Sequence, residues 1–181
     1  MTDTQDIYQR LGEQVGEVVK KAVKQAFIMQ GRTLTGALVN SIDYSVNATV
    51  TSAFIEFTLL DYGMILNYGV PANRIPFSPG SGAKSSKYID GLKMYAKLRF
   101  NANDKEAERI AFAIAHKHKK FGMPLDKKTG AVEEGIKESS DEVEELISEA
   151  LTKVINVMFL SSFAEVKKKN SDSLKIKYID I

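Results

Sequence analysis

The spacing of apolar residues predicts that the chain begins with a long helix. Over residues 4–30, apolar side chains recur at steps of three and four, which places them on one stripe of a helix. Gly12 and Gly16 stand four residues apart in this segment. They leave a flat strip on the helix, and we expect another backbone to approach closely there. A short helical turn over residues 35–40 is expected to follow.

The pattern then changes to a period of two, which is typical of a strand with one buried face. Alternating apolar positions occupy residues 42–50 and again residues 55–59, and the two runs predict an antiparallel hairpin. A third alternating run, with Leu174, Ile176 and Tyr178, predicts a C-terminal strand that joins the hairpin sheet. The apolar positions of the hairpin are Ile42, Tyr44, Val46, Ala48, Val50, Ile55, Phe57 and Leu59.

The rest of the chain is predicted to be helices and two long loops. Short helices are expected over residues 62–68, 87–99 and 104–120, with loops over 69–82 and 121–132. Ser139 and Glu142 have the spacing of a capping box, and the apolar pattern behind them predicts the strongest helix, through at least Phe163. The predicted fold class is α+β, a small antiparallel sheet packed by long N- and C-terminal helices. We expect a single domain over residues 1–181, in which residues 70–132 form a loop-rich helical insertion.

Composition fits a soluble globular protein. The chain has 181 residues, of which 44% are hydrophobic and 27% are charged, and it has no cysteine, so disulfides and thiolate metal sites are excluded. Its first residues are polar and acidic, unlike a secretory signal. Uninterrupted apolar runs such as Val157-Met158-Phe159-Leu160 are far shorter than the roughly 20 residues that span a bilayer. We therefore expect no membrane partner.

Charge is segregated although the net charge is only +2. The segment 84–120 has ten basic and four acidic residues, whereas 133–149 has eight acidic residues and one lysine. These runs are either two solvated faces, or surfaces with which one copy's basic segment meets another copy's acidic helix or lies near DNA phosphates.

A search for catalytic or ligand-binding patterns predicts no catalytic, cofactor-binding or metal-binding residues. The segment 80–86 contains glycine, lysine and serine but lacks the first glycine of a phosphate-binding loop. His116 and His118 lie roughly 200° apart on a helix among lysines, so an exposed pair is expected rather than a zinc site. The acidic residues of 133–149 are expected to form a solubilising surface. We expect that the protein is not an enzyme.

Nucleic-acid binding is the alternative function. Tyr88, Tyr95 and Phe100 interleave with basic residues in the segment 84–120, which offers both charge and stacking surface. At helical spacing, the same aromatic side chains are more naturally placed in the core with the lysines outside.

Several stretches resemble a family of small tail-component proteins of long-tailed bacteriophages. The stretch 36–42, Gly-Ala-Leu-Val-Asn-Ser-Ile, resembles the family's turn between a long helix and a β-hairpin. The stretch 62–70 resembles the pattern Tyr-Ala-x-Tyr-Val-Glu-x-Gly-Thr: Tyr62 and Gly69 match, but Ile65 and Asn67 replace the second tyrosine and the glutamate. The stretch 107–115, ending in Phe-Gly-Met-Pro at 121–124, is similar to phage neck and tail-completion proteins.

The resemblance implies a structural virion protein, a ring-forming subunit at the head–tail neck or tail with a tail-completion or connector role. Its expected partners are other copies of itself and neighbouring connector, tail-terminator or tail-tube proteins, with possible proximity to genomic DNA. Such a protein would reside in the virion and assemble in the host cytoplasm. The candidate contact residues lie in the long loop, in the helix after it and in the acidic helix: Arg74, Phe77, Lys84, Lys87, Glu142, Glu144 and Glu145.

Overall fold

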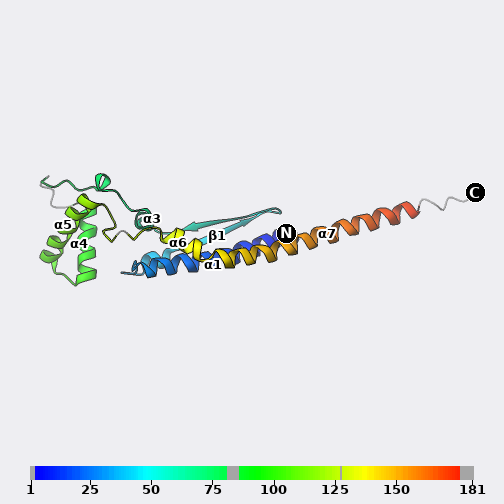
Figure 1. Ribbon diagram of the computed structural model, residues 1–181, viewed down its shortest axis with the longest axis horizontal. Helices are drawn as coiled ribbons and strands as arrows, with labels where there is room; N and C mark the ends of the chain where they lie inside the picture. Colours follow the sequence, from blue (N-terminus) through cyan, green and yellow to red (C-terminus); the bar gives the residue numbers. More distant parts are fainter. Residues whose placement is uncertain (1–2, 81–85, 127, 176–181) are drawn as a thin grey trace, which may run out of the picture. The chain divides into compact units, whose positions relative to one another are not determined.

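A computed structural model describes residues 3–80, 86–126 and 128–175, with side chains as far as Lys168 (Figure 1). In these ranges the elements are, in chain order, α1 (Asp3–Met29), α2 (Ala37–Ser41), β1 (Asp43–Ala48), β2 (Ala53–Thr58), α3 (Asp61–Tyr68), the 3-10 turn η1 (Ala72–Arg74), α4 (Lys87–Phe100), α5 (Asp104–Phe121), α6 (Ala131–Glu138) and α7 (Ser140–Lys175). The predicted α+β class is confirmed: long helices begin and end the described chain, and β1 and β2 form a two-stranded antiparallel sheet.

Two predictions about the C-terminal half need correction. The predicted strand that begins at Leu174 is wrong at its start, because α7 continues through Lys175; Ile176 and Tyr178 lie outside the described residues. Once a helix has begun, each further residue adds a hydrogen bond, whereas a strand at this position would need a partner for its backbone. The second correction is α6, a separate helix for which no element was predicted.

Contacts divide the chain into two compact units, each described here by itself. The first unit contains residues 1–20, 44–57 and 138–181, and the second contains residues 21–43 and 58–137. The segment 70–132, predicted to be an insertion, belongs entirely to the second unit.

In the first unit, the hairpin packs on the glycine strip of α1. A Cβ atom at Gly12 would collide with the side chain of Val46, and one at Gly16 would collide with the ring of Tyr44. The Tyr44 hydroxyl donates to the backbone carbonyl of Glu13 at 3.0 Å. The close approach predicted at this strip therefore exists, but the side chains of β1 make it rather than a backbone.

The strands have the predicted period of two. Tyr44, Val46 and Ala48 are the more buried positions of β1, and Ile55 and Phe57 are those of β2. The pattern fails at Val50, which is 51% exposed, because residues 49–52 form the turn that connects the strands.

In the second unit, the core contains Phe27 at the end of α1, Leu38 of α2 and Ile75 after η1. Helices α4 and α5 pack against each other through small side chains that are fully buried: Ala96, Ala107, Ala111 and Ala115. Asn103 begins α5 with a capping box. Its side chain accepts a hydrogen bond from the Glu106 backbone amide, and the Glu106 carboxylate accepts one from the Asn103 backbone amide.

The two long loops of the second unit are joined by a short backbone bridge. Val70 and Met123 exchange both hydrogen bonds, at 2.6 and 2.8 Å. Gly69 and Gly122 flank the bridge at φ 75° and 81°, and a Cβ atom on either glycine would lie 2.8 Å from a carbonyl oxygen of the opposite loop. Only glycine combines this backbone conformation with so close an approach.

By length and composition, α7 is able to cross a membrane. The segment Ser140–Lys168 is long and apolar enough to span a bilayer, and most of its apolar part is not buried in the structure. The sequence had been expected to offer no such segment, because the uninterrupted apolar runs are short. The hydropathy instead comes from an apolar stretch that isolated small and polar residues interrupt.

Candidate interaction surface

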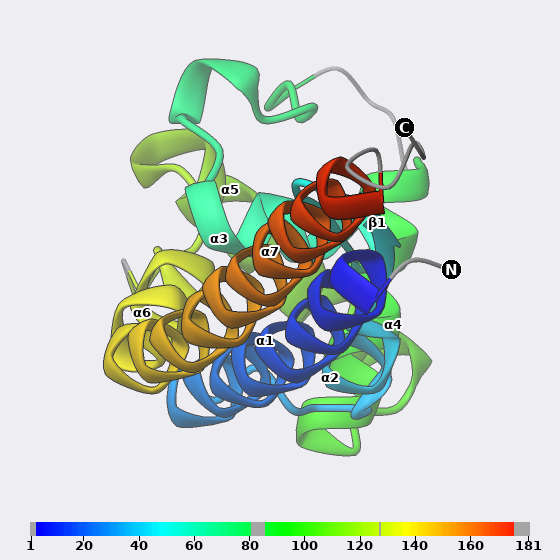
Figure 2. The same cartoon turned by 90° about the vertical axis from the view of Figure 1, so that its right-hand side faces the viewer.

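The first half of α7 packs against α1 in the first unit, and the two helices lie side by side in both views (Figures 1 and 2). Ala150 and Val154 are buried, and Val143 and Leu146 are half-buried on the same face. A groove of about 580 Å³ runs between the two helices. One face of α7 is therefore used inside the unit.

The second half of α7 continues past the N-terminal end of α1 (Figure 1) and has little cover. Its large apolar side chains are 57–69% exposed: Ile155, Met158, Phe159, Leu160, Phe163 and Val166. Residues 154–164 include no charged side chain. Monomeric proteins rarely expose a contiguous apolar surface of this kind without a binding partner.

The first turns of α7 carry the predicted acidic residues. Glu142, Glu144 and Glu145 are all exposed, and carboxylates at a helix N-terminus are favoured by the helix dipole. The acidic contact candidates and the exposed apolar side chains therefore belong to one helix.

The other contact candidates lie in or beside the second unit's long loop. Arg74 is exposed in η1, and Lys87 is exposed at the start of α4, whereas Lys84 lies outside the described residues. Phe77 is half-buried, with its ring centroid 4.9 Å from that of His116 in an edge contact. The loop is thus partly fixed to α5, which Lys119 reinforces by donating from Nζ to the Ile75 carbonyl at 3.2 Å.

The aromatic side chains of α4 do not all face the core. Tyr88 is half-buried, but Tyr95 is 40% exposed and Phe100 is 56% exposed. The last two form an edge-to-face pair with centroids 6.1 Å apart. Placement of all three rings in the core was therefore wrong, because buried alanines fill the contact between α4 and α5.

The prediction of an exposed histidine pair is wrong for His118. His116 is exposed, but His118 is buried, and its Nδ1 lies 2.7 Å from the Tyr88 hydroxyl. Burial lowers the pKa of His118 and raises the pKa of Tyr88 to about 12. Both groups are thus held neutral at physiological pH, and the contact between them is a structural hydrogen bond.

Asn67 is a buried polar residue whose role the sequence did not reveal. Its side chain is 1% exposed, accepts from the Val132 amide at 2.8 Å and donates to the Glu133 carboxylate at 2.9 Å. Its backbone carbonyl accepts from the Gly130 amide. Asn67 therefore satisfies the N-terminal backbone of α6 from another helix, a role usually filled by a local capping residue.

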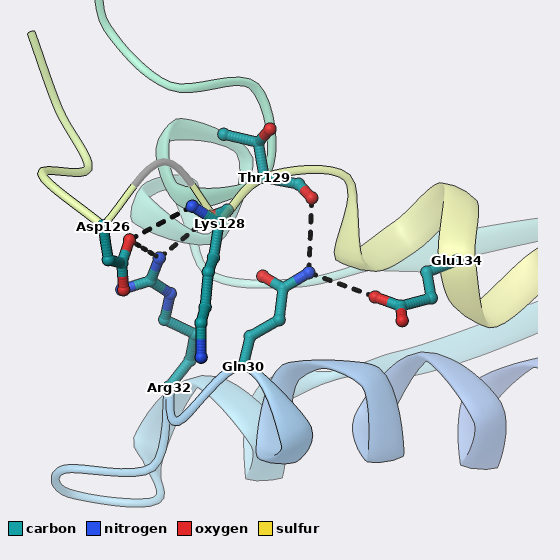
Figure 3. A network of polar contacts seen from close by, with 6 residues as sticks. All are labelled: Gln30, Arg32, Asp126, Lys128, Thr129 and Glu134. Atoms are coloured by element: carbon teal, nitrogen blue, oxygen red, sulfur yellow. Dashed lines mark hydrogen bonds and ion pairs between the residues drawn. The ribbon is translucent and has the colours of Figure 1, made fainter.

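A second polar network holds the end of α1 to the loop before α6 (Figure 3). Gln30 donates to the Thr129 carbonyl and to Glu134, and Arg32 donates to Asp126 at 2.9 Å. Partial burial raises the pKa of Asp126, but hydrogen bonds from Arg32 and from the Lys128 amide lower it by more. The net pKa is below its ordinary value, so the carboxyl stays ionised. These contacts are internal and orient a loop.

Within the described part of the chain, no group of three or more His, Asp or Glu side chains is arranged to hold a metal ion. Comparison with models of protein families, with curated proteins and with solved structures finds no match. The exposed apolar side chains of α7 are the most prominent candidate interaction surface among the described residues.

Proposed function

We propose that the chain is a structural virion protein of a tailed bacteriophage, a ring-forming subunit of the neck or tail with a tail-completion or connector role. It acts through the surfaces that it presents to copies of itself and to neighbouring connector, tail-terminator or tail-tube proteins. The observation that carries the proposal is the apolar half of α7, whose large side chains remain 57–69% exposed. A helix that is apolar on all sides needs a partner to cover it.

The order of elements supports the phage part of the proposal. The resemblance implies a long helix, a short turn and a β-hairpin, and α1, α2 and the β1–β2 hairpin follow in that order. Gly69 and Gly122, which belong to the resembling stretches, flank the bridge between the two long loops. These positions thus have a structural reason to be glycine, independent of any partner.

Segregated charge supplies a second element of the proposal. A closed ring uses a heterologous interface, in which two different patches of each subunit meet. The basic surface of α4 and α5 and the acidic start of α7 would serve as such patches, because opposite charge favours encounter and register. On this proposal Arg74 and Lys87 contribute on one side, and Glu142, Glu144 and Glu145 on the other.

The test is to reverse Glu142, Glu144 and Glu145 to lysine and to measure ring formation by electron microscopy and sedimentation. We expect the unmodified chain to form discrete rings and the variant to lose them. The control replaces three exposed carboxylates outside α7 with lysine, namely Asp3, Asp61 and Glu108. It therefore changes the net charge by the same amount as the α7 variant. Normal rings in the first variant, or none from the unmodified chain with its partner proteins, would overturn the proposal.

Nucleic-acid binding through the segment 84–120 is the second candidate, and the exposed Tyr95–Phe100 pair beside lysines favours it. A protein that neutralises several phosphates loses DNA affinity steeply as salt rises. This candidate would be supported if the logarithm of the DNA-binding constant falls linearly with the logarithm of the salt concentration and if Phe100→Ala binds DNA more weakly. Salt-independent or undetectable DNA binding would exclude it.

A further inference from the structure

Strand β2 is an open edge of the hairpin sheet. In the described ranges the sheet consists of β1 and β2, so β2 pairs with another strand along one side only. On the α1 side of the sheet, Ile55 and Phe57 remain half-buried, and on the other face Phe54 is 67% exposed. Proline and lysine commonly keep an edge strand from pairing further, and β2 contains neither. Its backbone is therefore available to a third strand.

The chain contains a segment whose composition suits such a strand. Residues 176–181 read Ile-Lys-Tyr-Ile-Asp-Ile, and four of the six are isoleucine or tyrosine, which favour strands. The segment lies outside the described residues and follows directly on Lys175, the last residue of α7. By composition it is suited to extend a sheet.

One antiparallel register matches this segment to β2. In that register the cross-strand pairs are Ile176 with Phe57, Lys177 with Glu56, Tyr178 with Ile55 and Ile179 with Phe54. Three pairs are apolar and one joins opposite charges, and cross-strand pairs of both kinds stabilise a sheet. Asp180 lies opposite Ala53 and gains no such partner. A parallel strand with the same charge pair would place Ile179 opposite Thr58 and lose the contact with Phe54.

The length of α7 decides which copy supplies the strand. The hairpin lies beside the N-terminal part of α1, where Gln5 bonds the Ala48 carbonyl, and α7 continues past that end of α1 (Figure 1). Val154 is the last buried side chain of α7 in the described range, and from there to Lys175 the helix runs about 32 Å. Six extended residues span about 20 Å. The segment therefore cannot return to its own β2 while α7 is helical.

We propose that residues 176–181 of one copy add to β2 of a second copy as a third, antiparallel strand. The contact joins two different surfaces, so each copy can give its strand to one neighbour and receive a strand from another. Such heterologous contacts build rings. The inference thus deepens the proposed function, on which it rests, by naming a second contact between neighbouring copies.

The first experiment measures the dissociation constant (Kd) of self-association by sedimentation. A chain that ends at Lys175 should have a Kd at least about a hundredfold higher than the full chain. Exchange of two neighbours, Ile176→Lys with Lys177→Ile, keeps the composition but places lysine opposite Phe57, and should raise Kd at least about tenfold. A full chain that stays monomeric, or an unchanged Kd in the shortened chain, would overturn the proposal.

The second experiment tests whether the contact joins two different surfaces. Phe54→Lys places a charge on the open edge and should also weaken association, whereas Phe121→Lys, at a side chain 64% exposed against 67% for Phe54, should not. Copies with the exchange of residues 176 and 177 still have an intact β2, and Phe54→Lys copies still have an intact strand. Mixing them should restore dimers. Mixed copies that stay monomeric, or equal weakening by Phe121→Lys, would count against the contact.

The third experiment determines register and orientation by disulfide trapping, because the sequence contains no cysteine. Phe54→Cys copies mixed with Ile179→Cys copies should form the mixed disulfide, and Thr58→Cys copies mixed with Ile179→Cys copies should not. The opposite result would indicate a parallel strand and refute the proposed register. In a chain that carries both Phe54→Cys and Ile179→Cys, the disulfide should link different copies, and a disulfide within one copy would refute the exchange.

Electron microscopy separates this contact from the proposed ring. Rings that form equally well from the chain ending at Lys175 would overturn the strand contact and leave the ring proposal standing. If the unmodified chain forms no rings with its partner proteins but still gives the disulfide between residues 54 and 179 of different copies, the ring proposal fails and the strand contact is supported.

Discussion

Replacement of Asn67 by leucine tests whether one buried amide holds the start of α6. Leucine has the same number of side-chain heavy atoms and branches at the same carbon, so the change removes two side-chain hydrogen bonds without opening a cavity. The bond from the Val132 amide is worth roughly 0.5–1.5 kcal/mol and the bond to the charged Glu133 roughly 1.5–3 kcal/mol. Because Glu133 is exposed and its carboxylate can return to water, we expect a net loss of about 2–3 kcal/mol.

Amide hydrogen exchange across α6 measures this loss directly, since it reports local opening. At 1.4 kcal/mol for each factor of ten, the exchange of residues 131–138 should become about 30- to 150-fold faster. The matched variant is Asn47→Leu, which changes an exposed asparagine on β1 and should leave α6 unchanged. Exchange in α6 that stays within about threefold of the unmodified chain would refute the capping role of Asn67.

Two further predictions concern the loop bridge and the buried histidine. Gly122→Ala should destabilise the protein by about 1–3 kcal/mol more than Gly80→Ala: both glycines have φ near 80°, but only Gly122 has a backbone oxygen 2.8 Å from the added carbon. Equal urea midpoints for the two variants would refute the close approach. Burial lowers the pKa of His118 below its ordinary value of 6.5, so the unfolded chain binds its proton more readily. The contribution of His118 to stability should therefore be fully present above about pH 6.5 and fall as pH drops through that value. His118→Phe should flatten the pH dependence of the thermal unfolding temperature between pH 5 and 8. An unchanged pH dependence would contradict the burial of a neutral His118.

The local elements of the fold were largely predictable because their signals are local. The period-two pattern located the hairpin, and the period near 3.6 located α1, α4, α5 and the start of α7 within a few residues. The C-terminal alternation misled because Leu174 is compatible with either period over so short a run. Helix α6 was concealed because its N-terminal backbone is satisfied by Asn67, a residue more than sixty positions earlier.

The environment of individual side chains was harder to predict than the helices that carry them. The position of His118 among lysines indicated an exposed surface, but its burial depends on Tyr88, thirty residues away in α4. Phe77 was singled out as a contact residue in a loop, yet its ring packs on α5. In both cases the deciding contact is tertiary, and no spacing within a single element records it.

The apolar residues of α7 are more numerous than a helix needs in order to pack against one neighbour. One packing partner needs a stripe on one face of a helix, and α1 covers such a stripe at Leu146, Ala150 and Val154. The apolar positions of α7 are more numerous than this stripe, and those left over are exposed around the rest of the helix: Ile147, Leu151, Ile155, Met158, Phe159, Leu160, Phe163 and Val166. Because the surplus turns gradually away from α1 along the helix, no single neighbour within the chain could cover both sets. An apolar surface larger than α7 can bury within its own fold is the observation on which the proposed partner contact rests.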